Sequence, residues 1–131
     1  MRWANHVRPT SDGNFGFVEA YDLTTGKSVW KVRHRTQESS ALVSTEGGVI
    51  FQGNRDRYFR ALDEKTGKTL WETRLPAQPN AYPITYTANG RQYVAITVGG
   101  GGPVDVNFQS YTPELVVPTA GTSLMVFALP R

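Results

Sequence analysis

Short runs of apolar and β-branched residues, separated by polar or glycine-rich breaks, divide the chain into strand-length segments. Four of these segments follow one another most clearly: 42–45, 49–52, 58–62 and 69–75. Gly47-Gly48 joins the first pair as a hairpin turn that requires positive φ, and "DEKTG" turns the chain before the fourth segment. Apolar and polar side chains alternate in that fourth segment, which is typical of a half-buried strand. The pattern predicts a unit of four short antiparallel strands.

An eleven-residue pattern occurs twice in the chain. Residues 20–30 read AYDLTTGKSVW and residues 61–71 read ALDEKTGKTLW, so the frame A-x-D-x-x-T-G-K-x-x-W recurs at an offset of 41 residues. Repeats of about 40 to 45 residues made from short strands are typical of β-propellers, in which each repeat is a four-stranded blade. The sequence therefore predicts an all-β chain that forms a single partial propeller domain over residues 1–131. The predicted blade-like repeats are about 16–36, 37–77 and 78–131.

Each residue that the two copies of the frame share has a structural explanation. The two copies supply Asp22, Gly26 and Trp30, and Asp63, Gly67 and Trp71. The aspartates can cap the turn by accepting hydrogen bonds from nearby backbone N–H groups. The glycines allow a left-handed turn residue, and the tryptophans can bury a large flat surface against the neighbouring blade. We therefore interpret the repeat as structural rather than catalytic.

The third repeat is altered. Residues 83–98 predict two alternating strands joined by Asn89-Gly90, which is a strong hairpin signal. A long insert, rich in glycine and proline, then occupies residues 99–122 before the strand pattern "SLMVFALP" begins at residue 123. Loops of this length are usually functional or disordered. No T-G-K frame follows, so the last blade lacks its fourth strand. About two and a half blades cannot close a ring, so we expect the chain to pack against the rest of a larger propeller or, as the alternative, against another copy.

Charge and composition exclude several functions. The chain has 14 Lys and Arg against 11 Asp and Glu, giving a net charge of +3. The basic residues are scattered over turns and strands, so we interpret Arg55, Arg57, Arg60 and Arg74 as solvated surface and expect no nucleic-acid partner. The absence of cysteine removes disulfides and thiol catalysis. No apolar run reaches the roughly 20 residues of a membrane span, and the N-terminal sequence lacks a secretory-signal pattern.

The repeated frame resembles the tryptophan-docking repeat of the quinoprotein dehydrogenases, which use pyrroloquinoline quinone (PQQ) and fold as eight-bladed propellers. Residues 44–102 resemble the C-terminal blades of these enzymes, and "SLMVFALP" resembles their final strand. The stretches "DRYFRALD" and "QYVAI" are more similar to the glucose and quinate dehydrogenase branch than to the methanol dehydrogenases. In such propellers the missing strand of the last blade comes from the N-terminal region of the chain.

The resemblance implies oxidation of an alcohol or sugar, usually in the periplasm. PQQ accepts the electrons, Ca²⁺ polarises its quinone carbonyl and a carboxylate takes the substrate proton. Earlier blades supply the catalytic base and the Ca²⁺ ligands, so the resemblance assigns no catalytic or metal residue to this chain. Two places match segments near the cofactor: Ser39 and Ser40, and Gly99 and Gly100. Related enzymes carry a tryptophan at the positions of Ser39 and Gly100, so that stacking role does not transfer.

Other candidate residues have simpler explanations. We expect His6 and His34 to be solvent-exposed, because neither has a ligand-spaced partner. Glu38 could act near the start of an inner strand, but a turn cap is favoured. Asp105, Asn107 and Glu114 could line a substrate entrance, but a solvated loop is favoured. The glycines at 99–102 do not form a phosphate loop, because no helix pattern follows them.

Two functional hypotheses remain. In the first, the chain is a C-terminal segment of a PQQ-dependent dehydrogenase with a small alcohol or sugar substrate, and is inactive alone. In the second, it is a non-catalytic propeller scaffold built from the same repeats, like the lipoprotein that helps assemble outer-membrane β-barrels. The long glycine-flanked insert favours the first hypothesis, since scaffold propellers tend to have more uniform blades.

Overall fold

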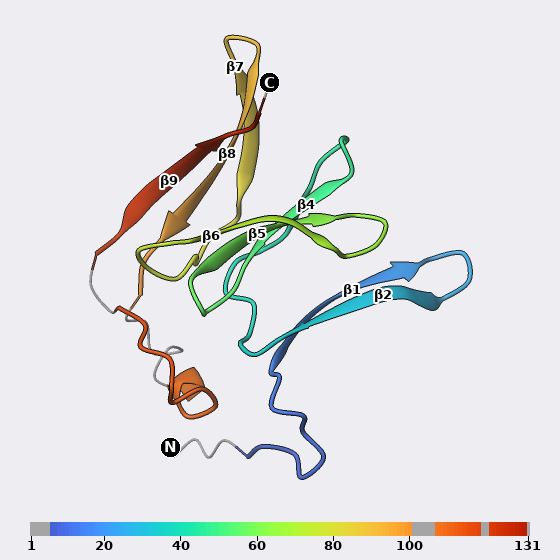
Figure 1. Cartoon of the computed structure of the whole chain (residues 1–131), viewed down its shortest axis with the longest axis vertical. Helices are drawn as coiled ribbons and strands as arrows, with labels where there is room; N and C mark the ends of the chain where they lie inside the picture. Colours follow the sequence, from blue (N-terminus) through green and yellow to red (C-terminus); the bar gives the residue numbers. More distant parts are fainter. Residues whose placement is uncertain (1–5, 101–106, 119–120, 131) are drawn as a thin grey trace.

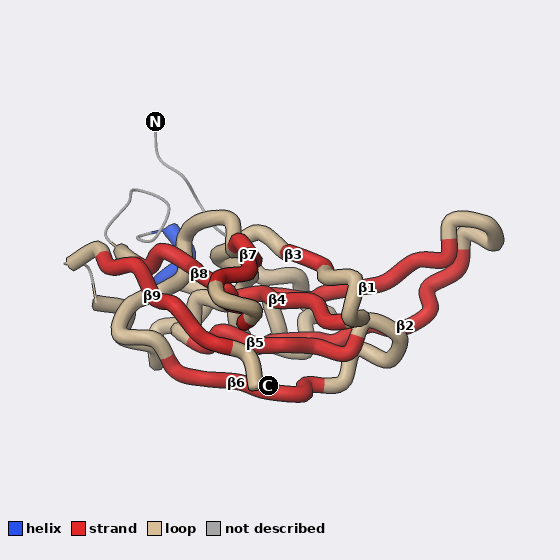
Figure 2. Tube along the Cα trace, turned by 90° about the horizontal axis from the view of Figure 1, so that it is seen from above, coloured by secondary structure: helices blue, strands red, loops and turns tan. Residues whose placement is uncertain are grey.

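A computed structural model describes residues 6–100, 107–118 and 121–130, and these form three antiparallel sheets (Figures 1 and 2). The first sheet pairs β1 with β2, the second has the order β3-β4-β5-β6, and the third has the order β7-β8-β9. The strands are β1 (Gly16–Asp22), β2 (Lys27–His34), β3 (Val43–Ser44), β4 (Val49–Gly53), β5 (Tyr58–Asp63), β6 (Thr69–Arg74), β7 (Ile84–Ala88), β8 (Arg91–Val98) and β9 (Ser123–Ala128). The predicted all-β class is confirmed.

The strands of the second sheet lie where the alternating pattern predicts them, and its two outer pairs are joined by tight turns. The Asn89-Gly90 hairpin also forms, with φ of 50° and 70°, as a type I′ turn requires. The repeated frame contains a further shared feature. The pairing register shifts between Ala20 and Tyr21 in the first sheet and between Ala61 and Leu62 in the second. Each copy of the frame therefore carries a β-bulge, which increases the local twist of its strand.

The T-G-K turns have the same hydrogen bonds in both copies. The Oδ1 atom of Asp22 accepts from the backbone N–H groups of Thr24 and Thr25, at 2.8 and 3.4 Å. The Oδ1 atom of Asp63 accepts from the N–H groups of Lys65 and Thr66, at 3.1 and 2.8 Å. The Thr24 N–H is the main cause that lowers the pKa of Asp22, whereas the Thr66 hydroxyl, which donates to Asp63 Oδ1 at 2.7 Å, is the main cause that lowers the pKa of Asp63. Gly26 and Gly67 complete the turns with φ of 66° and 70°.

Trp30 docks the first sheet onto the turn of the second. Its ring Nε1 donates a 2.8 Å hydrogen bond to the backbone oxygen of Glu64. The ring also packs against Gly67, where an added Cβ would stand 2.6 Å from Trp30 Cε3. Glycine is therefore required at this position for two reasons, its positive φ and the closeness of the indole. Neighbouring sheets are thus joined through the residues of the repeated frame.

The apolar core lies between the second and third sheets. In the part of the chain that the structure describes, its buried residues are Phe51, Phe59, Ala61, Leu75, Ala77, Val94, Ile96 and Val98. Phe127 from β9 packs against Trp71 and Phe59, with ring centroids 5.3 and 6.0 Å apart. Trp71 therefore contacts the next sheet, as Trp30 does, although 39% of its surface remains exposed.

The connections between strands alternate between two ends of the sheets. One end carries the hairpin turns: in Figure 1 the β1–β2 and β5–β6 turns, which hold the two T-G-K sequences, lie at the right, and the β7–β8 turn lies at the top. The other end, here called the loop end, carries residues 35–42, 54–57, 75–83 and the described part of 99–122. The loop end holds Ser39, Ser40, Gly99 and Gly100, the four positions predicted to lie near a cofactor.

Candidate functional site

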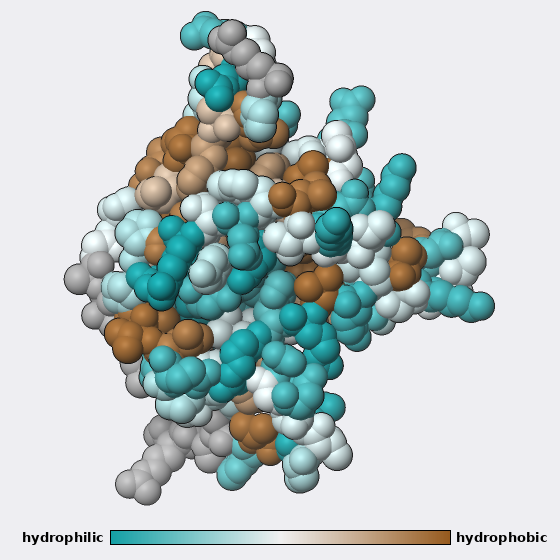
Figure 3. Space-filling view, in the orientation of Figure 1, coloured by the Kyte–Doolittle hydropathy of each residue, from teal (hydrophilic) through white to brown (hydrophobic). Residues whose placement is uncertain are grey.

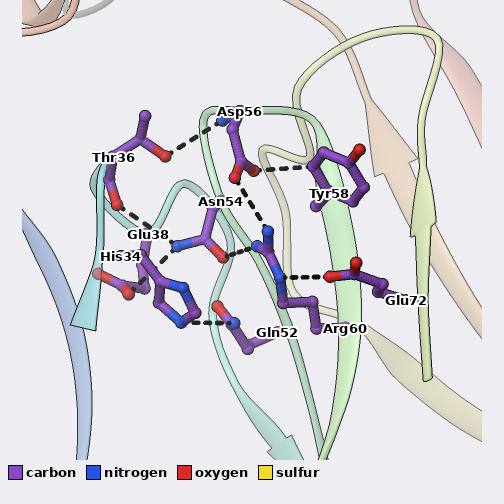
Figure 4. Close-up of polar contacts among 9 residues, drawn as sticks. All are labelled: His34, Thr36, Glu38, Gln52, Asn54, Asp56, Tyr58, Arg60 and Glu72. Carbon is purple, nitrogen blue, oxygen red and sulfur yellow. Dashed lines mark hydrogen bonds and ion pairs between the residues drawn. The ribbon is translucent and has the colours of Figure 1, made fainter. Parts of the chain in front are cut away.

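Polar side chains are buried at or next to the loop end (Figure 4). In the described part of the chain the buried polar residues are Thr36, Gln52, Asn54, Arg55, Arg60, Gln78 and Thr112. Burying a polar group requires compensating hydrogen bonds, so these residues form networks rather than isolated contacts. Two networks result, one around Arg60 and one around the insert.

Arg60 on β5 is the centre of the first network. Its Nη1 donates a 2.6 Å hydrogen bond to Asn54 Oδ1, and its Nη2 and Nε form ion pairs with Asp56 and Glu72, at 3.0 and 3.1 Å. The guanidinium also lies over the Tyr58 ring, 4.9 Å from its centroid. The interpretation of Arg60 as solvated surface was therefore wrong. Its planar fork satisfies three acceptors at once, which a solvated side chain would not need.

The network continues from Asn54 to the first sheet through Glu38. Asn54 Nδ2 donates to Glu38 Oε1 at 3.2 Å, and the Phe17 backbone N–H donates to Glu38 Oε2 at 3.2 Å. Glu38 therefore bridges two sheets and does not cap a turn, which corrects the favoured prediction. Burial raises its pKa above the ordinary 4.5. Its contribution to stability is present below pH 4.5 and is lost as pH rises through the raised value.

His34 lies at the end of β2 on the same side. It is half-buried, with its Nε2 atom 3.3 Å from Gln52 Nε2, so the expectation that it is exposed was wrong, whereas His6 is exposed. Burial, together with the charge of Arg60, lowers the pKa of His34 below 6.5. The imidazole is consequently neutral near pH 7.

The lowered pKa of His34 predicts a pH-dependent stability. Between that lowered value and 6.5 the unfolded chain binds more protons than the folded chain, so the free energy of unfolding should decrease as pH falls through this window. His34→Gln is expected to remove this slope, as measured by urea unfolding from about pH 5 to pH 8. Glu38→Gln is the matched control, because Glu38 has the opposite slope. A histidine variant with an unchanged pH profile would contradict the assignment.

Ser39 and Ser40 are held in place by Gly53 at the end of β4. The Gly53 backbone oxygen accepts from both serine N–H groups, at 3.0 and 3.2 Å, and the Ser40 hydroxyl accepts from the Gly53 N–H at 2.8 Å. A Cβ on Gly53 would collide with Pro79 Cγ, so only glycine allows this approach. The segment 39–40 is thereby placed next to the equivalent segment of the following sheet.

Gly99 occupies the place in the third sheet that Arg55 occupies in the second sheet. Its N–H donates to the Gln78 oxygen at 2.9 Å, as the Arg55 N–H donates to the Gln37 oxygen at 3.0 Å in the second sheet. A Cβ on Gly99 would contact Thr122 and Asn80, at 3.1 and 3.3 Å. Gly100 is partly exposed. The two predicted pairs therefore lie at the same end of adjacent sheets, linked through Pro79, which bridges to Val98.

The insert contacts both earlier sheets. Arg35 donates to the Tyr111 backbone oxygen at 3.0 Å and pairs with Glu114 at 2.8 Å. Arg55 donates to the Thr112 hydroxyl at 3.3 Å, and both of these residues are buried.

These contacts correct one expectation, because Arg55 is buried and is not solvated surface. Glu114 is exposed, and its carboxylate pairs with Arg35. Asn107 is exposed in a short helical turn, whereas Asp105 lies outside the described residues.

Comparison with known proteins places this geometry in a family. The family described as "Glucose/ethanol/alcohol dehydrogenase, beta-propeller domain" matches residues 32–94. The quinoprotein alcohol dehydrogenase PedE of Pseudomonas putida is 38% identical over 125 residues, covering 95% of this chain and 20% of that protein. The chain belongs to the quinoprotein dehydrogenase β-propeller family. The predicted resemblance is confirmed.

Other quinoprotein dehydrogenases are also similar to the chain in sequence and structure. Quinoprotein glucose dehydrogenase A of Acinetobacter calcoaceticus is 36% identical over 129 residues, covering 84% of this chain and 16% of that protein. The structure of a europium-containing methanol dehydrogenase matches with a TM-score of 0.78 and 33% identity, over 90% of this chain and 24% of that one. The glucose branch is thus represented among relatives of similar identity. The chain spans a fifth or less of the length of these curated relatives.

The scaffold alternative has a more distant counterpart. BamB from Moraxella catarrhalis matches with a TM-score of 0.54 and 22% identity, over 73% of this chain. Similarity at this level shows a shared fold alone. The higher identity to quinoprotein dehydrogenases therefore carries the functional argument.

PQQ is the cofactor of the quinoprotein family, and its carboxylate and quinone oxygens require hydrogen-bond donors. Ser39 fits this need, because its Oγ is buried and has no hydrogen-bond partner in the described part of the chain. A buried hydroxyl without a partner calls for an explanation, such as a ligand or a water molecule. The Ser40 hydroxyl is already committed to Gly53 and Ala41. Gly99 and Gly100 have no side chain, so they could contact a cofactor only through their backbone atoms.

Two further observations concern metal ligands and membrane spans. Within the described ranges, no group of three or more His, Asp or Glu side chains is placed to hold a metal ion. The same residues contain no helix long and apolar enough to cross a membrane.

Proposed function

We propose that the chain forms C-terminal blades of a PQQ-dependent dehydrogenase that oxidises an alcohol or a sugar in the periplasm, and that it is inactive alone. The observation that carries the proposal is the 38% identity to a quinoprotein alcohol dehydrogenase over 95% of the chain. When bound, PQQ together with Ca²⁺ would supply the electron-accepting chemistry. The catalytic base and the Ca²⁺ ligands would come from other blades.

Ser39 is the residue of this chain that we expect to hold the cofactor, through its hydroxyl. The Gly53 oxygen fixes its backbone, and the bridge between Glu38 and Asn54 fixes the preceding residue. Preorganised donors of this kind bind without further loss of conformational freedom. Ser40 would support this arrangement through its bond to Gly53, and Gly99 and Gly100 would provide a close backbone wall.

The third sheet would meet the remaining blades or another copy of the chain. It exposes apolar side chains on its two outer strands, and Figure 3 shows apolar surface over this part of the molecule. The exposed residues are Ile84, Tyr86, Leu124 and Val126. Contiguous apolar surface of this kind marks an interaction site.

A chimera tests the proposed function. The chain is substituted for the 125-residue matching segment of the Pseudomonas putida alcohol dehydrogenase. We expect the chimera to oxidise an alcohol only when PQQ and Ca²⁺ are supplied, because the relative contributes the base and the metal site. Dye-linked dehydrogenase assays measure the turnover, and the chain alone should show none. A folded chimera without PQQ-dependent turnover would contradict the proposal and favour a scaffold.

Ser39→Ala in the same chimera tests the cofactor contact. Loss of one hydrogen bond should weaken PQQ binding about tenfold, which a titration followed by PQQ absorbance measures directly. Ser40→Ala is the matched control. It should affect stability more than cofactor affinity, because the Ser40 hydroxyl bonds only within the chain among the described residues. Equal affinities of the Ser39 variant and the parent chimera would contradict the contact.

A further inference from the structure

A separate cavity of about 250 Å³ lies between the β4–β5 turn, the end of β6 and the docked insert. Three arginines line it, Arg55, Arg57 and Arg74, together with the aliphatic residues 115–117. Pockets for drug-sized ligands are usually larger than this, so the space suits a molecule of only a few heavy atoms. None of the four predicted cofactor positions lines the cavity.

The cavity carries uncompensated positive charge. Two carboxylates also line it, Asp56 and Glu114. Asp56 forms an ion pair with Arg60 at 3.0 Å and Glu114 forms one with Arg35 at 2.8 Å, and neither of these arginines lines the cavity. Among the described residues no ion pair forms with Arg57 or Arg74.

Arg57 is the last residue of the β4–β5 turn, and Arg74 is the last residue of β6. Arg74 is paired in register with Tyr58, the residue after Arg57, and the Leu75 N–H donates to the Arg57 oxygen at 2.7 Å. Both arginines line the cavity, so an anion bound there would interact favourably with two positive charges.

The backbone of Arg57 supports a role for its side chain. Its φ is +70°, a left-handed conformation that glycine adopts freely and that a side-chain-bearing residue adopts at a cost. Turn geometry alone would therefore favour glycine here. Within the described ranges the Arg57 guanidinium makes one hydrogen bond, from Nη1 to the Pro76 oxygen at 3.3 Å. An arginine kept in a strained position with most of its donors unused points to recognition of an anion.

The insert adds an apolar wall beside these cations. Val116 is 84% exposed although it lines the cavity, and Leu115 and Val117 flank it. An inorganic anion would gain nothing from this wall, whereas an aliphatic chain would bury apolar surface against it. The ligand that matches both surfaces is a carboxylate with a short hydrocarbon chain.

We propose that this cavity binds a small organic carboxylate. Arg57 and Arg74 donate hydrogen bonds to its oxygens, and its aliphatic chain packs against Val116. Guanidinium groups match the planar carboxylate geometry better than that of a spherical ion. The proposal does not depend on PQQ or on dehydrogenase activity, since it concerns other residues.

Butyrate binding to the full chain tests the proposal. Saturation-transfer NMR should show contact with butyrate, with weaker binding of acetate and inorganic phosphate and none of butylammonium. Arg57→Gly should reduce the butyrate affinity at least tenfold. It should also raise the melting temperature by a few degrees, because glycine relieves the strained φ. This combination separates loss of a site from loss of the fold.

Two control variants complete the experiment. Val116→Ser should reduce the preference for butyrate over acetate and leave acetate binding unchanged. Lys68→Met removes an exposed positive charge away from the cavity and should leave both affinities unchanged. Butyrate affinity unaffected by Arg57→Gly, or equal responses to butyrate and to chloride at matched ionic strength, would overturn the proposal.

Discussion

Replacing Arg60 by methionine is expected to lower the free energy of unfolding by about 3 kcal/mol. The substitution removes the donors of Asn54 Oδ1 and Asp56 at once, and Asn54 is fully buried. An unsatisfied buried amide oxygen and a partly buried carboxylate without its partner both favour the unfolded chain. Urea unfolding followed by circular dichroism measures the effect.

Two further variants separate burial from charge. Arg60→Lys keeps the charge but loses the fork, so it should lose about half as much stability as the methionine variant. Arg33→Met removes an arginine whose ion pair with Asp12 is about half exposed on both sides, and should change stability by less than about 1 kcal/mol. If the methionine variants at positions 60 and 33 lost equal amounts, the Arg60 network would not contribute as a buried unit.

The strands could be predicted from sequence because their signals are local. Asn89-Gly90 defines a hairpin by its own backbone preferences, and the two T-G-K turns repeat one arrangement of aspartate and glycine. The position of Trp30 against Gly67 follows from the same frame, since both residues are frame positions of neighbouring repeats. Local turn chemistry and a fixed repeat length therefore account for most of the fold.

The contacts of the insert were missed because their partners are distant in sequence. Arg35 reaches Tyr111 across 76 residues, and no local pattern connects them. Arg60 did carry a signal: it stands within the run YFRALD between the buried residues Phe59 and Ala61, four residues after Asp56. A charge inside an apolar strand of this kind indicates a buried pair rather than surface. Net charge and composition could not reveal this.

Gly67→Ala should destabilise the chain by about 3 kcal/mol, of which about 1 kcal/mol reflects the positive φ and the rest the collision with Trp30 and Val32. An ideal Cβ at this position would lie 2.6 Å from the indole, so the ring must leave its place against the turn. Gly26 provides the matched control, because it has nearly the same φ and a Cβ there would meet nothing within 4 Å. Gly26→Ala should therefore lose only about 1 kcal/mol.

A double-mutant cycle decides whether the indole is the cause. In a Trp30→Ala background the indole is gone and Val32 Cγ2, 2.9 Å from the added Cβ, is the remaining close neighbour. Gly67→Ala should then lose clearly less than the ~3 kcal/mol lost in the parent chain, and the coupling between positions 30 and 67 should be about 1 kcal/mol or more. A Gly67→Ala loss that stays the same without the tryptophan would mean that backbone strain and the Val32 contact explain this glycine. The contact between neighbouring sheets would then have to rest on the Glu64 hydrogen bond to the ring.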